Sequence, residues 1–352
     1  MFPRFRLPAA LLAAALTCLL PATGNAQAAK TTTLRVASAG GLFTDLQRRY
    51  AAEIFTRQTG IKVEFIDGNA HDHLTKLVAA RGRNVPFDVA YLDEDVHDAA
   101  VRLKLVQKID PAIVTNLEHI IDKAKSPENY GPFLQFLSTG IAFNRKKFQE
   151  AGIPTPTSWK DLWDPRLAGK IAIPELSHPT GRGFVIAAAR LEGSDERDLS
   201  KGIESIAKIK AHSYFSSTVQ AEALFTTGDV WAAPMPSGRA WGLHAKNRDI
   251  WFFDPKEGGV SSPYVIDVVA GTPNAKAANE YVNAVLHPLQ QLGQATELSF
   301  TPVNKEVLAL LKGYPDIANK LVDTSTIYQP NWAAFTRNYD NAVQLWNRHV
   351  VR

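Results

Sequence analysis

Cysteine is almost absent from this chain of 352 residues, and its single cysteine, Cys18, lies near the N-terminus. The N-terminal stretch begins with two arginines, continues with an apolar run and ends with the small residues Ala26-Gln27-Ala28. This order is typical of a secretory signal peptide. We therefore expect residues 1–28 to be cleaved near Ala28 on export, which leaves 324 of the 352 residues without any cysteine.

Long apolar runs and a large excess of charge are missing as well. The run from Leu7 to Leu20 is shorter than the roughly 20 residues that a membrane span needs, and no later segment approaches that length. The chain has 39 basic and 35 acidic residues, a net charge of +4, and loss of Arg4 and Arg6 with the signal peptide leaves +2. So small an excess does not indicate binding to nucleic acid or to a membrane surface. We expect a soluble exported protein that apolar cores stabilise without disulfide bonds.

Motifs of common enzyme classes are also absent. The chain has no Gly-x-Ser-x-Gly elbow, no phosphate-binding P-loop, no His-Glu-x-x-His helix and no dinucleotide glycine fingerprint. His71 and His73 are two residues apart, so they do not share a helical face, and no third metal ligand follows at a diagnostic spacing. We predict no cofactor and no bound metal, and an exported enzyme is a remote alternative.

Segments with strand and helix patterns alternate along the rest of the chain. This alternation predicts an α/β fold with mainly parallel sheets, whose strands end in polar or glycine-rich turns where such sheets bind ligands. The predicted strands are Leu34–Val36, Ile61–Phe65, Phe87–Leu92, Gly140–Asn144, Lys170–Ile173, Val230–Ala233 and Ile250–Phe253. The clearest predicted helices are one that Gly41 opens and the C′ glycine Gly60 ends, His71–Arg81, Arg182–Leu191 and Thr218–Thr227, with further helices after Asn274.

The segment GIAFNRKKFQEAGIPTPTSWKDLWDPRLAGKIAIPE, Gly140–Glu175, contains a strand ending in Phe-Asn and then Ser158, Trp159, Asp161–Pro165, Gly169 and Lys170. Further matches are Ser38–Phe65, Asp254–Gly259 and Phe300–Val307. In these segments the sequence resembles the periplasmic solute-binding proteins of ABC importers, specifically the spermidine/putrescine-binding-like group. The resemblance covers essentially the whole chain after the signal peptide.

This resemblance implies a type II periplasmic-binding-protein fold, with two α/β lobes and a solute held in the cleft between them. We expect residues 29–138 with 268–325 in lobe 1 and residues 139–267 with 326–352 in lobe 2. Hinge closure is the expected working cycle, with delivery of the solute to an inner-membrane ABC permease. A monomer is the family's usual state, and the fold alone does not name the ligand.

The segment from Ser177 to Arg182 departs from the pattern of the polyamine binders. Where those proteins carry an acidic pair that holds ammonium groups, this chain has Ser-His-Pro-Thr-Gly-Arg. A later Trp-x-Asp segment of the family is represented only by Asp267. We therefore predict a small anionic or zwitterionic solute, namely an amino-carboxylate, an opine-like compound or a phosphonate. A polyamine remains the alternative.

The helix predicted to follow this segment offers two interpretations. Its unpaired first amides, the Ser177 or Thr180 hydroxyl and the Arg182 guanidinium could together bind an anion. Alternatively, Ser177 or Thr180 only caps the helix and Arg182 points to solvent.

Other candidates follow strands that end near the predicted cleft. The glycine-rich turn after the first strand is a second possible anion site with an apolar wall, and the acids after the third predicted strand could bind an ammonium group. The full set of predicted ligand-binding residues is Ser38, Gly40, Gly41, Phe43, Asn69, His71, Asp93, Glu94, Thr139, Ser177, Thr180, Gly181, Arg182, Ser237, Arg239, Tyr264 and Asp267.

Overall fold

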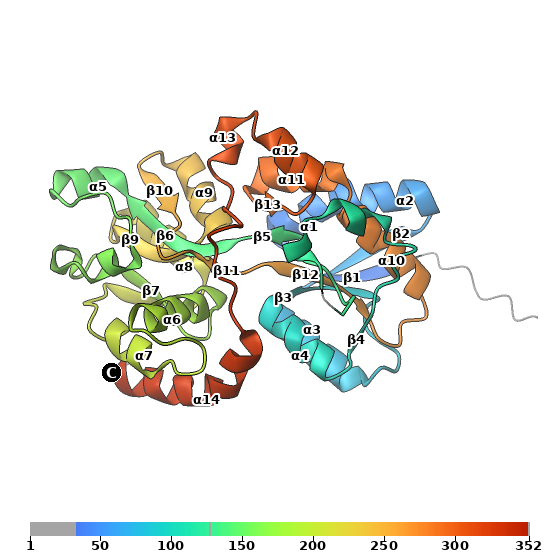
Figure 1. The fold of residues 1–352 in the computed structure, drawn as a ribbon, viewed down its shortest axis with the longest axis horizontal. Coiled ribbons are helices and arrows are strands. Elements are labelled where there is room, and N and C mark those ends of the chain that lie inside the picture. Colours follow the sequence, from blue (N-terminus) through green and yellow to red (C-terminus); the bar gives the residue numbers. More distant parts are fainter. Residues whose placement is uncertain (1–32, 127, 351–352) are drawn as a thin grey trace, which may run out of the picture. The chain divides into compact units, whose positions relative to one another are not determined.

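A five-stranded sheet organises the N-terminal part of the computed structural model, which describes residues 33–126 and 128–350 (Figure 1). Its strand order is β2-β1-β3-β12-β4. β1 pairs in parallel with β2 and β3, whereas β12 is antiparallel to β3 and β4. β12 therefore inserts a late segment of the chain into the N-terminal sheet. The strands are β1 (Thr33–Ser38), β2 (Lys62–Asp67), β3 (Val89–Asp93), β4 (Val106–Gln107) and β12 (Tyr264–Val269).

A second sheet forms around β6 (Ser138–Asn144), whose seven residues are all buried. β6 pairs with three antiparallel neighbours, β9 (Ala232–Pro236), β10 (Ile250–Phe253) and β11 (Val260–Ser261). The alternation of strands and helices had predicted mainly parallel pairing, but periodicity does not encode strand direction. Two short pairs complete the strands, β7 (Ala172–Pro174) with β8 (Ser213–Phe215) and β5 (Gln135–Phe136) with β13 (Thr301–Pro302).

Helices connect and cover these strands. Those of the first half are α1 (Gly41–Gln47), the π-helix η1 (Arg48–Ala52), α2 (Glu53–Thr59), α3 (Ala70–Ala80), α4 (Glu94–Arg102), α5 (Arg145–Glu150) and α6 (Pro179–Leu191). Those of the second half are α7 (Ser200–Ile206), α8 (Thr218–Thr227), α9 (Ser237–Lys246), α10 (Ala275–Val285), α11 (Pro288–Leu298), α12 (Lys305–Leu311), α13 (Pro315–Ala318) and α14 (Trp332–His349). None of them, within the described ranges, combines the length and apolarity needed to cross a bilayer.

Both faces of the five-stranded sheet carry apolar side chains, and its strands β1, β3 and β12 are mostly buried, whereas the edge strand β2 is partly exposed. On β1, Leu34 and Val36 join a core that includes Phe55 and Tyr281, whereas Ala37 belongs to a separate core with Phe87. The second sheet has its own cores, and all the described residues belong to one compact unit. The two sheets thus have separate apolar cores within this unit.

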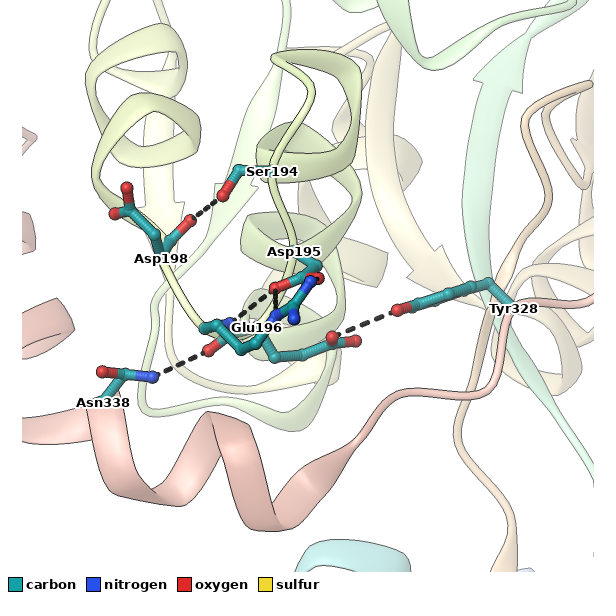
Figure 2. Close-up of polar contacts among 7 residues, drawn as sticks. Ser194, Asp195, Glu196, Asp198, Tyr328 and Asn338 are labelled. Atoms are coloured by element: carbon teal, nitrogen blue, oxygen red, sulfur yellow. Dashed lines mark hydrogen bonds and ion pairs between the residues drawn. The ribbon is translucent and has the colours of Figure 1, made fainter.

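The C-terminal segment packs against helices of the second sheet. α14 lies beside α7, and its Trp346 shares a core with Phe184 of α6 (Figure 1). Figure 2 shows the hydrogen bonds between the loop that joins α6 to α7 and this segment. The Tyr328 hydroxyl donates to Glu196 Oε2 at 3.1 Å, and the Asn338 amide donates to the Glu196 carbonyl at 3.1 Å. The route of the chain from Tyr328 into α14 is therefore fixed by polar contacts as well as by apolar packing.

The predicted element positions are largely confirmed. α8 and β10 have the predicted bounds, and Gly60 ends α2 with a left-handed φ of 75°. The expected lobe boundary after Asp267 falls inside β12, which pairs with β3 from Tyr264 onward. A boundary before Tyr264 keeps this strand whole, because a strand belongs to the sheet with which it pairs.

Two helical glycines give a test of the packing between α6 and α7. A Cβ on Gly202 of α7 would lie 2.5 Å from the backbone nitrogen of Ala189, whereas a Cβ on Gly242 of α9 would have no neighbour within 4 Å. We expect Gly202→Ala to lower the free energy of unfolding by about 1–3 kcal/mol through overpacking. Gly242→Ala is the control and is expected to raise it by about 0.5–1 kcal/mol. Urea unfolding measures both, and equal effects would contradict the predicted close approach.

Candidate functional site

A small cavity lies where the first turn of α4 meets the first turn of α6. Its volume is about 20 Å³, close to the minimum that admits one water molecule. A larger hollow of about 450 Å³ is lined only by residues between 225 and 250 and lacks carboxylates. The small cavity instead gathers segments that are far apart in the sequence. It is lined by Asp93, Glu94, Asp95, Thr139, Pro179, Arg182, Gly183, Ser261, Ser262, Pro263 and Trp332.

Arg182 is the one cationic side chain among those lining residues, and only 4% of it is exposed. Its Nη2 lies 3.2 Å from Asp95 Oδ2, and its Nη1 donates to the Ser177 carbonyl at 2.9 Å. Its Nε–H is buried and has no hydrogen-bond partner in the described part of the chain. Since buried donors normally find an acceptor, this group indicates a place where an acidic ligand group could bind.

The start of α6 contradicts the interpretation in which Ser177 or Thr180 caps the helix and Arg182 points to solvent. The helix begins at Pro179, three residues before the predicted start, and the residue that caps it is His178. The His178 Nδ1 accepts the Thr180 N–H at 3.2 Å, so neither Ser177 nor Thr180 is the cap. Burial, with the nearby positive charges of Arg182 and Arg239, lowers the pKa of His178 to about 4. The imidazole is therefore neutral near pH 7 and can act as an acceptor.

α6 approaches β6 closely beside this turn. Gly183 allows this approach, because a Cβ there would lie 3.0 Å from Thr139 Oγ1 of β6. Gly181 instead allows α6 to lie close to the segment after β7, because a Cβ there would lie 1.9 Å from the Glu175 carbonyl oxygen. Thr139 and Arg182 consequently line the same cavity. The Thr180 side chain is buried and Gly181 does not reach the lining.

Three consecutive acids, Asp93, Glu94 and Asp95, face Arg182 from the start of α4. Asp93 is the N-cap residue of α4, but its side chain makes no capping hydrogen bond. Burial and the neighbouring Asp95 carboxylate raise the pKa of Asp93 to about 7, against the opposing pull of Arg182. The cavity therefore has more acidic than basic side chains, and near neutral pH the Asp93 carboxyl is partly protonated.

Glu94 connects α4 to the segment that leads into α14. Its Oε1 accepts from Gln329 Nε2 at 3.1 Å, and its Oε2 accepts from Trp332 Nε1 at 2.9 Å. Burial raises the pKa of Glu94 to about 7, although both hydrogen bonds favour the ionised form. Both oxygens of Glu94 are thus engaged by the protein, so Glu94 holds the C-terminal segment near the cavity.

Aromatic side chains lie next to the acids but outside the cavity lining. Tyr264 is the cross-strand neighbour of Asp93, and its ring centroid is 4.9 Å from that of Phe43. Burial and the Asp93 charge raise the pKa of Tyr264 above its ordinary value, with Arg239 acting in the opposite direction. Phe43 and Tyr264 therefore form an apolar pair on the side of Tyr264 that adjoins Asp93, and the predicted ligand contact of Phe43 stays a prediction.

The glycine-rich turn after β1 is occupied by its own hydrogen bonds. The Gly40 N–H donates to Thr44 Oγ1 at 2.9 Å, and Ser38 Oγ is 2.7 Å from the same oxygen. Ser38 is buried, whereas Gly41 is exposed. None of these three predicted residues lines the cavity.

Four other predicted residues also lie outside the cavity lining. Asn69 caps α3 by accepting from the Asp72 N–H, and His71 is exposed in the first turn of that helix. Ser237 does not cap α9, because its Oγ accepts the Ser138 N–H at 3.3 Å. Arg239 is 57% exposed and lies 3.5 Å from Glu222.

Asp267 has a structural role that the sequence did not indicate. It is fully buried in β12, where its Oδ2 lies 2.8 Å from His97 Nδ1 and its Oδ1 accepts the Gly131 N–H. Burial lowers the pKa of His97, but the Asp267 carboxylate outweighs this and raises it above its ordinary value. Both oxygens face the protein interior, so the expected ligand contact of Asp267 is corrected to an internal ion pair.

Comparison with known proteins identifies the family. Residues 50–321 match the bacterial extracellular solute-binding proteins. The chain belongs to this family. A Salmonella typhimurium protein whose name describes 2-aminoethylphosphonate binding is 24% identical over 309 residues, 84% of this chain and 85% of its own. The Escherichia coli spermidine/putrescine-binding periplasmic protein is 23% identical over 293 residues, 80% of this chain and 81% of its own.

A solved structure agrees with this assignment. An ABC transporter protein from Clostridium perfringens has a TM-score of 0.75 and 25% identity, and the likeness covers 90% of this chain and 99% of that chain. This solute-binding protein therefore has the two-lobed α/β fold of the ABC-importer binding proteins, and the resemblance to the spermidine/putrescine-binding-like group is confirmed. Family membership implies a small-molecule ligand, a membrane permease as partner and export to the periplasm. The predicted signal peptide lies outside the described residues.

Sequence reasoning missed several lining residues of this solute-binding protein. Asp95 directly follows the two predicted acids, so the run Asp-Glu-Asp was a usable signal. Ser261 and Ser262 also line the cavity, but they lie outside the family's Trp-x-Asp pattern and gave no signal of their own. Trp332 and Gln329 gave no signal, because only the folded chain brings residues more than 230 positions apart to Glu94.

The raised pKa of Glu94 predicts how stability depends on pH. In the folded protein Glu94 binds a proton at pH values where the unfolded chain, with the ordinary value of 4.5, has lost it. This contribution is complete at low pH and is lost as the pH rises through about 7. We expect Glu94→Gln to flatten the fall in melting temperature of the ligand-free protein between about pH 5 and pH 8. Calorimetry at constant ionic strength measures this slope.

A matched control is Glu150→Gln, which changes an exposed acid of α5. It should keep the slope of the unmodified protein. Equal slopes for Glu94→Gln and the unmodified protein would mean that Glu94 titrates as an ordinary exposed carboxylate.

Proposed function

We propose that this solute-binding protein captures a small solute whose acidic group binds Arg182 between α4 and α6, and delivers it to an ABC permease. Amino-carboxylates, opine-like compounds and phosphonates carry such a group. The protein acts as a periplasmic monomer after cleavage near Ala28, and it has no catalytic role. The observation that carries this proposal is the Arg182 Nε–H, a buried donor without a partner on a side chain that lines the cavity.

The chemistry of arginine supports this choice of ligand group. A guanidinium group presents several N–H donors in a planar fork that fits carboxylates and phosphonates. Arg182 is held in place by the Ser177 carbonyl and by its position inside α6, so the fork is pre-organised. A ligand acid that accepts from Nε–H would complete the hydrogen bonding of a buried charge.

The alternative function is polyamine binding, which one set of observations favours. Asp93, Glu94 and Asp95 outnumber Arg182 at the cavity, and ammonium groups need nearby negative charge. The similarity to relatives does not decide between a phosphonate and a polyamine ligand, because the identities to the two named proteins are nearly equal, at 24% and 23%. Glu94, however, already uses both oxygens within the protein, which reduces the free carboxylates to Asp93 and to an Asp95 that is paired with Arg182.

Binding of any such solute requires the two sides of the cavity to separate. A cavity of about 20 Å³ holds one water molecule and no larger solute. α4 belongs with the five-stranded sheet and α6 with the second sheet, and each sheet has its own cores. We propose that the lobes, residues 29–138 with 264–325 and residues 139–263 with 326–352, open and close by hinge motion.

Thermal shift measurements on the chain from Ala29 onward test the ligand class. We expect amino-carboxylates, opine-like compounds or phosphonates at about 100 times their Kd to stabilise the protein by roughly 2.7 kcal/mol, a shift of a few degrees for a chain of this length. Arg182→Gln should abolish the shift, because it removes the cation that receives the acid. Arg182→Lys should weaken it, because lysine keeps the charge but lacks the planar fork.

The matched control is Arg102→Gln at the exposed end of α4, which removes the same charge away from the cavity and should preserve the shift. A shift with spermidine or putrescine that survives Arg182→Gln would contradict the proposal and favour the polyamine alternative.

A further inference from the structure

The ion pair between Arg182 and Asp95 points to a more specific ligand. Resting on the proposed function, we infer that the solute is a zwitterion that inserts between Arg182 and Asp95, so that its acidic group binds Arg182 and its ammonium group binds Asp95. Asp95 is then the residue that selects zwitterions over simple anions. The Asp95 carboxylate stands, in the structure, where an acidic ligand group would accept from Arg182.

The geometry of the pair supports an exchange of partners. Asp95 Oδ2 is 3.2 Å from Arg182 Nη2, and the two side chains are 13% and 4% exposed. The pair bridges α4 of the first sheet and α6 of the second sheet, and both residues line the cavity. Separation of these helices would open the ion pair and leave a cation on one side and an anion on the other.

The charges of Arg182 and Asp95, which closure of the cleft buries again, decide which solute fits. A buried charge that loses its partner is strongly unfavourable. A simple anion would neutralise Arg182 and leave Asp95 unpaired, whereas a simple cation would neutralise Asp95 and leave Arg182 unpaired. A zwitterion supplies both charges, so that one ion pair is replaced by two and no charge remains unpaired. The free-energy cost of opening the ion pair is therefore smallest when the ligand carries an amine as well as an acid.

Neighbouring groups fit an ammonium group beside Asp95. Asp93 is close enough to Asp95 and Arg182 for both charges to affect its titration, and an adjacent cation would favour its ionised form. Tyr264 is the cross-strand neighbour of Asp93 and packs against Phe43, so its ring could pack against the carbon chain of a short solute. Other charged groups near this first turn include Glu94, His97, Asp98 and Lys123, whereas Arg239 lies near Tyr264.

Pairs of solutes that differ only in the amine give the test. The probes are 2-aminoethylphosphonate with ethylphosphonate, and β-alanine with propionate, each titrated by isothermal calorimetry at pH 7. For the unmodified protein we expect the aminated member of a pair to bind at least about tenfold more tightly, because a hydrogen bond to a charged group discriminates by that factor. Asp95→Asn should abolish this preference, and Asp95→Glu should retain part of it.

The matched control is Asp98→Asn, which removes an acid one turn further along α4 that is absent from the cavity lining. It should keep the preference for the amine. If Asp95→Asn binds the aminated member as selectively as the unmodified protein does, the inference is wrong. If Arg182→Gln still abolishes binding in that case, the proposed function stands. If the unmodified protein binds neither aminated member while another acid without an amine gives a thermal shift that Arg182→Gln abolishes, the inference is wrong and the proposed function stands.

Discussion

The contact between the first turns of α4 and α6 is the constraint on which the rest of this site depends. It contains a buried guanidinium, Arg182, paired with the Asp95 carboxylate at 3.2 Å. Charges that leave water need partners, so each of these side chains fixes the position of the other. One residue earlier, Glu94 receives hydrogen bonds from Gln329 and Trp332. A single helical turn therefore organises the segments around the cavity.

The distribution of apolar cores explains why this contact is polar. The strands of the first sheet are enclosed by Leu34, Phe55 and their neighbours, and the helices of the second sheet are joined by cores that include Phe184 and Trp346. The side chains that meet between α4 and α6 include the charged pair of Asp95 and Arg182, which water can solvate when the helices part. A polar joint between separate cores is the physical requirement for a cleft that opens and closes.

The sequence predicted those parts that local patterns encode. Helical periodicity and turn residues set the bounds of α8 and β10, and the strand-helix alternation predicted the fold class. The sequence analysis missed that α6 begins at Pro179. Proline suits the first helical position, but the cap before it is His178, and histidine is not one of the usual capping residues. Sequence reasoning also assigned Asp267 to the ligand, because the burial of its partner His97 depends on contacts between β12 and α4. Residues joined only by tertiary structure leave no periodic signal.

The balance of charge at the cavity bears on the ligand chemistry, which the similarity to the two named relatives leaves open. Identities of 24% and 23% to proteins named for a phosphonate and for polyamines describe shared ancestry of the fold and leave ligand chemistry open. A site for a polycation needs carboxylates that are free of internal cations, whereas here Arg182 occupies Asp95 and the protein's own donors occupy Glu94. Because Arg182 lies inside a helix and is nearly unexposed, it cannot turn away to solvent when a cation approaches. In the proposed binding mode the fixed guanidinium receives the negative charge of the solute, and the facing aspartates receive the positive charge of the same molecule.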